Sequence, residues 1–522
     1  MSFQQGLSGL AGAAKSLDVI GNNIANSGTV GFKQSQVQFS DIYARSLNGV
    51  GGAVAGIGVT VAAIAQQFSQ GNIETSSNPL DIAINGAGFF RTEVNGAIQY
   101  SRNGQFQLDK NGFMVNAQLA KLTGYNADTN GKILAGAPEP IMINPGDMMP
   151  QETTSVKTQV NLNSHSQQPE TTPFDADDTT SYNRQIPTQV FDTLGNPHTM
   201  SSFYVKTGTN TWDVYVAADG MELASANVAA LVQTDPSTIA ARAAFQTAVN
   251  LQPPDPAGVI TAAQAYAAAA GAVMEAGAVA ASATAAQIQN INDAYFPAGR
   301  QAELGSMTPD QIDATIGAAV KVPAIAQGTL LFTTTGALDK TNMLLQQDPT
   351  QAAGILQTLP FSFDLPLFPD TGAVKPLTIE FDLTGSTQIF DDTAEKKTVQ
   401  DGYSGGALTT FAAGADGIII GQYSNGRTRP LAQIVLADFA NPNGLDPLGN
   451  NAWRETSASG VPLVGEPNTG KFGLLRSSAV EVSNVDLTAE LVNMITAQRA
   501  YQANAQTIKT QDSVMQTLVN LR

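Results

Sequence analysis

The chain contains few residue patterns that could support chemistry. Its two histidines, His165 and His198, have no neighbouring ligands at metal-binding spacing. The acidic run DADD at 175–178 fails as an EF-hand calcium loop, because the sixth position counted from Asp175 is not glycine and Ile186 stands where the final acid is needed. We interpret this run as a solvated acidic loop.

A second candidate is GEPNTGKF, residues 465–472, which matches the phosphate-binding pattern G-x-x-x-x-G-K. That loop also requires Ser or Thr next and a helix whose N-terminus faces the phosphate. Phe472 follows instead, and Glu466 would repel a phosphate. No serine, histidine and acid form a recognisable catalytic pattern. The sequence therefore predicts no catalytic, cofactor-binding or metal-binding residues, and we expect that the chain is not an enzyme.

Composition limits the alternatives further. With 522 residues, the chain is long enough for about three domains. Charged residues make up only 13%, against about 25% in ordinary domains, which suits contacts that exclude water. The net charge of −18 argues against nucleic acid or an anionic membrane as a partner. Charges nearly cancel in 1–72 and in 479–522, so the acidity belongs to 73–478.

Cysteine is absent, which excludes disulfide and thiolate chemistry and leaves the compartment open. The first residues, MSFQQGLSGL, lack the basic and apolar regions of a secretory signal. The apolar run at 49–65 is glycine-rich and shorter than the about 20 residues of a membrane span. We interpret it as a connector that leads into a buried strand, with no insertion into a membrane.

Near the N-terminus, apolar side chains recur every three or four residues, which predicts one face of a helix. They are Leu7, Leu10, Ala14, Leu17, Ile20 and Ile24. Several glycines interrupt this pattern, and an isolated helix of this length is marginal in water. The helix therefore needs a partner surface, which its glycines would allow to approach closely.

The stretch NNIANSGTVGFKQS, residues 22–35, predicts the end of this helix. Asparagines can satisfy the last carbonyls, and Gly28 and Gly31 allow the chain to turn away. Phe32 is expected to anchor the connector, with Lys33 at its rim.

A second helix is predicted from Leu487 to the C-terminus, where seam positions alternate in steps of four and three. These positions are Leu487, Leu491, Met494, Gln498, Tyr501, Ala505, Ile508, Asp512, Met515 and Val519. Ser483 or Asn484 is expected to cap it. An ordinary core helix with imperfect patterning would show similar spacing. We favour a coiled coil with the N-terminal helix, in which Gln498 and Asp512 set the register.

The middle of the chain is rich in strand patterns. Asn-Gly pairs at 85–86, 95–96, 103–104 and 111–112 predict hairpin turns in an antiparallel meander. Further strands are predicted after Asp416, and in a third section that an alanine-rich stretch at 222–327 interrupts.

The predicted fold is multi-domain and mainly β. Two antiparallel β domains are nested between N- and C-terminal α-helices that pair as a coiled coil, and the outer domain carries an Ala-rich helical insert. The predicted segments are an axial helix and connector at 1–72, an inner β domain at 73–148 and 402–478, an outer β domain at 149–401 with the insertion at 222–327, and an axial helix at 479–522.

Three segments resemble the bacterial flagellar rod and hook protein family. SLDVIGNNIANSGTVGFKQSQVQFSDIY resembles the N-terminal signature, and SNVDLTAELVNMITAQRAYQANAQTIKTQDSVMQTLVNLR the C-terminal signature. NPLDIAINGAGFF is similar to the entry of the first β domain. The alanine-rich insert lies outside the common pattern. An outer β domain and the segment GQYSNGRTRPLAQIVLADF are similar to hook members rather than to the shorter rod members.

This resemblance implies a structural subunit that forms a homopolymer, a curved and flexible tube that acts as a universal joint and transmits torque from rod to filament. It implies rod, hook-cap and hook–filament junction proteins as partners, and export by the flagellar type III apparatus without a cleaved signal to an extracellular location. The nearest alternative is a distal rod-type axial protein, and a secreted adhesin or hydrolase is a distant one.

The resemblance also predicts which residues act in assembly. Apolar side chains of both terminal helices would pack in the polymer: Leu7, Leu10, Leu17, Ile24, Phe32, Leu487, Leu491, Met494, Tyr501, Ile508 and Met515. Glycines beside the first helix would act as a hinge: Gly49, Gly51, Gly52, Gly56 and Gly58.

Overall fold

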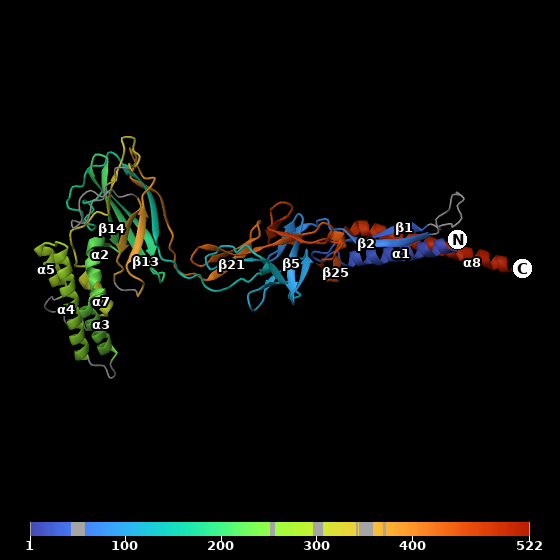
Figure 1. Ribbon diagram of the computed structural model, residues 1–522, viewed down its shortest axis with the longest axis horizontal. Coiled ribbons are helices and arrows are strands. Elements are labelled where there is room, and N and C mark those ends of the chain that lie inside the picture. The colour runs from blue at the N-terminus through green and yellow to red at the C-terminus, as the bar shows by residue number, and fades with distance from the viewer. Residues whose placement is uncertain are drawn as a thin grey trace. The chain divides into compact units, whose positions relative to one another are not determined.

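The computed structural model describes residues 2–42, 58–250, 256–295, 306–340, 343, 359–368 and 372–520. The chain divides into two compact units. The first unit combines Met1–Asp147 with Ala407–Arg522, and the second is the continuous segment Met148–Gly406. Both ends of the chain therefore build one unit, and the middle builds the other (Figure 1).

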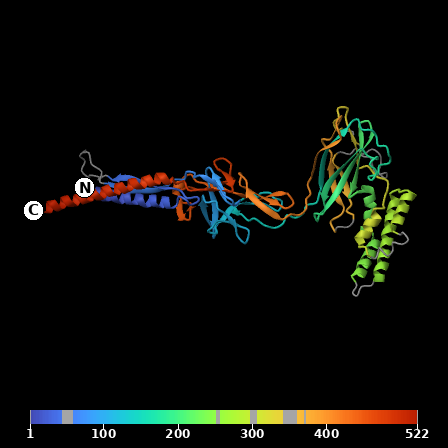
Figure 2. The ribbon, with the colours of Figure 1, turned by 180° about the vertical axis from the view of Figure 1, so that it is seen from behind.

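Two terminal helices, α1 (Ser2–Ala25) and α8 (Leu487–Asn520), lie side by side in both views (Figures 1 and 2). A Cβ atom placed on Gly6 would lie 3.2 Å from Ile508, whereas Asn23 at the other end of α1 contacts Glu490. The helices therefore run antiparallel. Gly9 faces Asn504 so closely that a Cβ atom would lie 2.7 Å from its side-chain oxygen.

A hairpin of β1 (Ser35–Ile42) and β2 (Gly58–Gln66) packs on another side of α1. Gly12 of the helix lies against Phe39 of β1, where an added Cβ would be 3.2 Å from the ring. The predicted strand is β2, which begins inside the apolar run at 49–65 and not after it; residues 60–64 of this strand are exposed, so its predicted burial is wrong. The described residues of this unit leave residues 60–64 exposed.

The remaining strands of the first unit come in two groups from the two ends of the chain. The earlier group is β3 (Ile73–Thr75), β4 (Ile82–Asn85), β5 (Phe89–Val94), β6 (Ala97–Ser101), β7 (Gln107–Leu108), β8 (Met114–Val115), β9 (Lys121–Asn126) and β10 (Glu139–Pro140). The later group is β21 (Leu408–Ala413), β22 (Ile418–Tyr423), β23 (Thr428–Ile434), β24 (Leu436–Asp438), β25 (Asp446–Gly449), β26 (Ala452–Arg454), β27 (Leu463–Gly465), β28 (Leu474–Ser477) and β29 (Ala479–Glu481), with a short helix η2 (Pro442–Gly444).

Strands of the two groups are interleaved. The main sheet has the order β21-β22-β23-β9-β5-β6-β26-β25, and β28 pairs with β4 and β29 with β3. Aromatic rings from both groups fill the space beside it, with Tyr100 4.8 Å from Phe439 and Phe68 5.5 Å from Trp453 between ring centroids. Neither group of strands could form a buried core alone. This explains why β segments from the two ends of the chain combine in one unit.

The four Asn-Gly pairs have different roles. Asn95 and Gly96 both have positive φ and form the predicted two-residue turn between β5 and β6. Gly112 lies in a longer turn between β7 and β8. The other two pairs are not hairpin turns, because the strand before Gly86 pairs with β28 and Gly104 packs tightly on the carbonyl of Ile82.

The second unit contains two sheets that enclose one apolar core. One sheet has the order β17-β18-β11-β19 with β20 on β11, and the other has the order β12-β13-β14-β15 with β16 on β14. Their bounds are β11 (Ser155–Asn163), β12 (Arg184–Phe191), β13 (Pro197–Gly208), β14 (Thr211–Ala218), β15 (Met221–Glu222), β16 (Gly328–Leu331), β17 (Phe361–Leu365), β18 (Leu377–Asp382), β19 (Thr387–Ile389) and β20 (Ala394–Gln400). β11 runs parallel to β18 and β19, a pairing that the prediction of antiparallel domains did not include.

Between β15 and β16 the chain forms a helical insert with its own core. Its helices are α2 (Leu223–Ala230), η1 (Leu231–Gln233), α3 (Pro236–Val249), α4 (Pro256–Ala280), α5 (Ala285–Tyr295) and α7 (Pro309–Gly317). α4 is long and apolar enough to cross a bilayer by length and composition, yet Tyr266 and Met274 on it are buried in the core of the insert. Asp313 joins three helices, because it accepts a hydrogen bond of 2.6 Å from Tyr266 and pairs with Arg242 at 3.1 Å.

The mainly β fold with paired terminal helices and a helical insert is confirmed. The limits of the five predicted segments stay a prediction, beside the two units that the contacts define.

Candidate functional site

The best-defined cluster of functional groups lies where α1 leaves α8 and enters the β part of the first unit. We call it the joint: residues Asn23 to Ser35 together with Arg102, Glu481, Asn484 and Glu490. After α1 ends, the backbone amide of Gly31 donates to the carbonyl of Glu481 at 2.8 Å. Gly31 has φ +73° and its added Cβ would lie 2.6 Å from the amide nitrogen of Asn103, so only glycine fits this turn.

A buried carboxylate stands at the centre of the joint. Oε1 of Glu481 lies 2.7 Å from Nζ of Lys33, and Oε2 lies 3.1 Å from Nη1 of Arg102. Oε1 also accepts from the backbone of Gly71 at 2.9 Å. Two cations thus share one buried carboxylate, and each donates to a carbonyl as well, Lys33 to Ser69 at 2.8 Å and Arg102 to Gly86 at 2.9 Å.

Burial has a clear electrostatic consequence here. Removal from water disfavours the charged forms and lowers the pKa of Lys33, while Glu481 acts in the opposite direction. Burial lowers the pKa of Arg102 in the same way. Lys33 was predicted at the rim of the connector, and this prediction is wrong, because its side chain is only 1% exposed. Its partner is 448 positions away in the sequence, so no local pattern could reveal the pair.

Amide side chains complete the joint. Asn23, 1% exposed, donates to the carbonyl of Ser35 at 2.8 Å and accepts from its amide at 2.9 Å. Asn23 and Gln34 both donate to Oε1 of Glu490, a buried residue at the start of α8. Oε2 of Glu490 is buried and has no hydrogen-bond partner within the described residues. The predicted helix end is therefore also a docking point for α8.

Asn484 was expected, like Ser483, to cap α8, and the structure assigns that role to Asp486. Its carboxylate accepts from the amides of Thr488 at 2.8 Å and Ala489 at 3.1 Å. Asn484 instead accepts from the amide of Gln34 at 2.8 Å and donates to the carbonyl of Gln67 at 2.8 Å. It ties both sides of the hairpin to the start of α8.

The residues predicted to pack in a polymer lie in different environments. Phe32 is buried in the joint, and Leu10, Leu17, Ile24, Met494 and Ile508 are half-buried. The others are exposed: Leu7, Leu487, Leu491, Tyr501 and Met515. Gln498 and Asp512, predicted on the seam between the helices, are exposed as well, so they do not set the register of α1 against α8.

Of the predicted hinge glycines, Gly49, Gly51, Gly52 and Gly56 lie outside the described residues. Gly58 begins β2 with φ +146°, and an added Cβ would lie 2.2 Å from Oγ of Ser8. Close approach to α1 is therefore a sufficient reason for glycine at this position.

The histidine and the phosphate-loop-like segment have structural environments. His198 lies on β13, with Nδ1 2.7 Å from Asp219 and Nε2 3.5 Å from Asp192. The hydrogen bond to Asp219 raises its pKa. Within the part of the chain that the structure describes, no three acidic or histidine side chains form a metal-binding group. The segment 465–472 is followed by β28, a strand, where a P-loop requires a helix.

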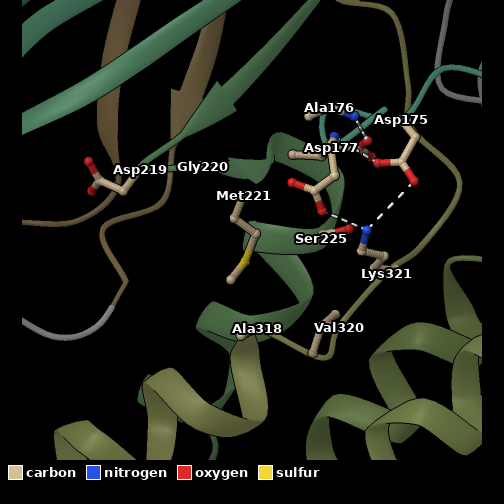
Figure 3. A pocket seen from close by; sticks show the side chains of 11 residues that line it. Asp175, Ala176, Asp177, Asp219, Gly220, Met221, Ser225, Ala318, Val320 and Lys321 are labelled. Carbon is tan, nitrogen blue, oxygen red and sulfur yellow. Dashed lines mark hydrogen bonds and ion pairs between the residues drawn. The ribbon is translucent and has the colours of Figure 1, made fainter. Parts of the chain in front are cut away.

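The acidic run at 175–178 borders a cavity of about 260 Å³ in the second unit. Nζ of Lys321 lies 2.7 Å from Asp177 and 3.6 Å from Asp175, as the dashed lines in Figure 3 show. Glu222 accepts from the amide of Ala176 at 2.9 Å, and burial raises the pKa of Glu222 to about 7. The loop is thus partly paired, and it ties the sheet to the start of the insert.

Comparison with known proteins identifies relatives along the whole chain. Four family models match: the flagella basal body rod protein at 3–33, the flagellar hook protein FlgE/F/G D1 domain at 83–161, the flagellar basal body protein FlaE D2 domain at 161–308 and 298–403, and the flagellar basal body rod FlgEFG protein C-terminal at 476–521. The joint is built from residues in or beside the first and last of these segments, together with Arg102 from the D1 segment.

Curated relatives match from end to end. The flagellar hook protein FlgE of Escherichia coli (strain K12) is 38% identical, and the match covers 100% of both chains. The flagellar hook protein FlgE of Borreliella burgdorferi is 28% identical over 100% of this chain and 99% of its own. The crystal structure of Helicobacter pylori flagellar hook protein FlgE2 is 13% identical, with a TM-score of 0.43 over 78% of this chain and 100% of that chain.

Proposed function

The chain belongs to the flagellar hook protein family and is a structural subunit of the hook, and we propose that copies of it assemble into a curved, bendable tube that transmits torque from rod to filament. The family places it in the flagellar hook and basal body. What remains to be explained is how the surface of one subunit would produce such a polymer.

The observation that supports self-assembly is the amount of apolar surface left exposed near the chain ends. Monomeric proteins rarely leave large contiguous apolar patches in water. In the described residues of α1, the hairpin and α8, the exposed large apolar side chains are Phe3, Leu7, Phe39, Ile42, Val61, Ile64, Leu487, Leu491, Val492, Ile495, Tyr501, Val514 and Met515. Residues 1–72 and 479–522 also carry little net charge, so copies would not repel one another there.

The two terminal helices pair with each other along one face only. Leu491, Val492 and Ile495 on α8 are each 50% exposed or more, although α1 packs on the same helix. A neighbouring copy is the partner that would cover these three exposed side chains of α8. A heterologous contact of this kind produces an open helical polymer when the rotation between copies does not close.

The finer functional assignments belong to the same proposal. We propose that the subunit is exported by the flagellar type III apparatus without a cleaved signal peptide, and that it contacts rod, hook-cap and hook–filament junction proteins. Its net charge of −18 makes nucleic acid an unfavourable partner. We propose a structural role without catalysis, because the polar groups of the joint pair with one another and hold the two ends of the chain together.

Electron microscopy of the purified chain under polymerising conditions tests the assembly proposal. We expect tubes that are curved and bendable. Straight, rigid tubes would favour a distal rod-type protein, and a chain that stays monomeric at high concentration would contradict self-assembly. Hydrolysis of polymeric substrates by the purified chain would instead support a secreted enzyme.

The hinge proposal is separate from assembly. Alanine at Gly49, Gly51, Gly52 and Gly56 together should straighten or stiffen the polymer, because alanine restricts the backbone conformations that glycine allows. Gly58 is left unchanged, since alanine there would collide with Ser8. Normal curvature of polymers that carry the four substitutions would contradict the hinge role.

A further inference from the structure

One leucine has the left-handed backbone conformation, which elsewhere in the described chain is found at glycine, asparagine, aspartate and serine. Leu119, in the turn between β8 and β9, has φ +61°. The other described non-glycine residues with positive φ are Asn95, Asn210, Asp219, Ser282, Asn450, Asn451, Asn468 and Ser478. Left-handed geometry is costly for a side chain such as leucine, because Cβ approaches the backbone oxygen.

The same turn occurs six more times in the described chain, which allows a direct comparison. In each, the first residue donates from its amide to the carbonyl four positions later, and the amide of the fourth residue donates back to the first carbonyl. For the Leu119 turn these bonds join Asn116 and Ala120 at 3.0 Å, and Leu119 and Asn116 at 3.0 Å. The equivalent fourth residues are all glycines with φ between +76° and +83°: Gly112, Gly131, Gly195, Gly336, Gly417 and Gly426.

Side-chain hydrogen bonds also hold the turn that contains Leu119. Oδ1 of Asn116 accepts from the amides of Gln118 at 3.0 Å and Ala120 at 2.9 Å, in addition to the two backbone bonds. Glycine would satisfy the same bonds without strain. Gly426 shows this clearly, because an added Cβ there would meet nothing within 4 Å, and glycine is explained by its φ alone.

Leu119 is 68% exposed, so its side chain gains little burial in its own subunit. An exposed leucine by itself is common on protein surfaces. A leucine that is both strained and exposed lowers the stability of the isolated chain twice, through its backbone and through its contact with water. A contact outside the subunit would compensate for both effects.

We propose that Leu119 is an assembly contact, whose side chain inserts into an apolar surface of a neighbouring copy in the polymer. This rests on the proposed function, since it needs copies that assemble. The chemistry of the turn favours a copy of this chain over an ionic partner. Residues 113–120 carry no charge, and Lys121 beyond them lies 4.0 Å over the ring of Phe113 and is turned towards its own unit. Another copy offers low-charge apolar surface of the same kind.

Substitution of Leu119 by glycine should therefore stabilise the folded monomer and weaken polymerisation. In Leu119→Gly the unfolding equilibrium constant of the monomer should fall about fivefold or more, because the strain is relieved. The concentration needed for polymerisation should rise about tenfold or more, because an apolar contact is lost. Leu119→Met, which keeps the apolar side chain, should polymerise like the unchanged chain.

The reciprocal variant Gly426→Leu is a matched control, since it places the same side chain in the same turn at a different site. It should destabilise the monomer and should not lower the concentration needed for polymerisation. A Leu119→Gly chain that polymerises like the unchanged chain would overturn the proposal. Failure of the unchanged chain to polymerise would instead overturn the assembly proposal.

Cross-linking provides an independent measurement. The chain has no cysteine, so Leu119→Cys introduces the only thiol. After labelling with a benzophenone maleimide, irradiation should produce covalent dimers in the polymer and none in dilute monomer. Polymers that assemble but show no cross-link between copies from position 119 would contradict the contact.

Discussion

At the residue scale, the ion pairs around Glu481 join distant parts of the first unit through a buried charge cluster. The carboxylate is 1% exposed and binds Lys33 and Arg102 together. Removal of one partner from a buried pair is costly because it leaves a charge in an environment that solvates it poorly. The joint should therefore depend on Lys33, Arg102 and Glu481, the three charged residues of this cluster.

Lys33→Met should destabilise the assembled subunit by about 1–3 kcal/mol, because it preserves most of the side-chain volume but removes the donor to Glu481 and to the carbonyl of Ser69, while Arg102 still pairs with the carboxylate. The measurement is the temperature at which polymers of the variant dissociate. Lys157→Met is the control, since Lys157 and Asp382 are 2.7 Å apart with side chains 48% and 22% exposed. A surface pair of this kind contributes less than about 1 kcal/mol. Equal dissociation temperatures for both variants would contradict the importance of the buried pair.

Glu222 should make the second unit less stable as the pH rises. Burial raises the pKa of Glu222 in the folded chain to about 7, from 4.5. A raised pKa contributes stability that is complete below about pH 4.5 and is lost as the pH rises through 7. Glu222→Gln should therefore unfold at a higher temperature than the unchanged chain at pH 8.5, and the difference should diminish towards pH 4.

Thermal unfolding at several pH values, followed for the transition of residues 148–406, gives the comparison. Glutamine retains the acceptor for the amide of Ala176, so this hydrogen bond is present in both the variant and the unchanged chain. Glu170→Gln changes an exposed carboxylate of the same unit and should show no such pH dependence. A constant difference between Glu222→Gln and the unchanged chain at all pH values would contradict the role of ionisation.

At the element scale, the helical insert is connected to the rest of the second unit through β15 and β16, which both pair with β14. β15 pairs with β14 through Glu222 and Ala217, and β16 pairs with the same strand through Gly328 and Val214. The two ends of the insert therefore lie along one strand. This arrangement is typical of an insertion that the sheet tolerates.

Deletion of residues 223–327, with a short Gly-Ser linker in their place, should leave the β sheets folded and polymerisation intact. Within the described residues, Phe368 is the one member of the insert's core cluster that lies outside 223–327, so the deletion is best combined with Phe368→Ser. Circular dichroism of the monomer and electron microscopy of the polymer provide the measurements. A folded deletion variant that forms no tubes would show that the insert carries an assembly contact.

At the scale of the whole molecule, the exposed apolar faces of α1, the hairpin and α8 indicate that the terminal parts are stable only in the polymer. An isolated helical pair with one open apolar face gains too little burial to resist local unfolding. Limited proteolysis of the monomer should therefore remove both terminal segments and leave a core near residues 72–478, identified by mass spectrometry. The assembled polymer serves as the control, in which the termini should be protected. Protection of the termini in the monomer would contradict this expectation.

The sequence by itself determined the features that depend on short-range order. Helical spacing from Leu7 to Ile24 and from Leu487 onward indicated both terminal helices, because the 3.6-residue period is a local property. Asn95-Gly96 indicated its hairpin for the same reason, since the turn requires two residues with positive φ. The nested order of β segments and the alanine-rich insert followed from composition along the chain.

Only the tertiary structure decided which of these features meet. Lys33 and Glu481 pair across 448 positions, and β11 runs parallel to strands more than 200 positions away, which no local pattern encodes. Gln498 fitted the seam by spacing but is exposed, because the rotation of α8 is set by its contacts with α1 and not by its own period. The sequence does not indicate the strain at Leu119, because a leucine between two strands is ordinary until the turn fixes its φ at +61°. Long-range packing selects one arrangement among many that local preferences allow, and the joint and the strained leucine are products of that selection.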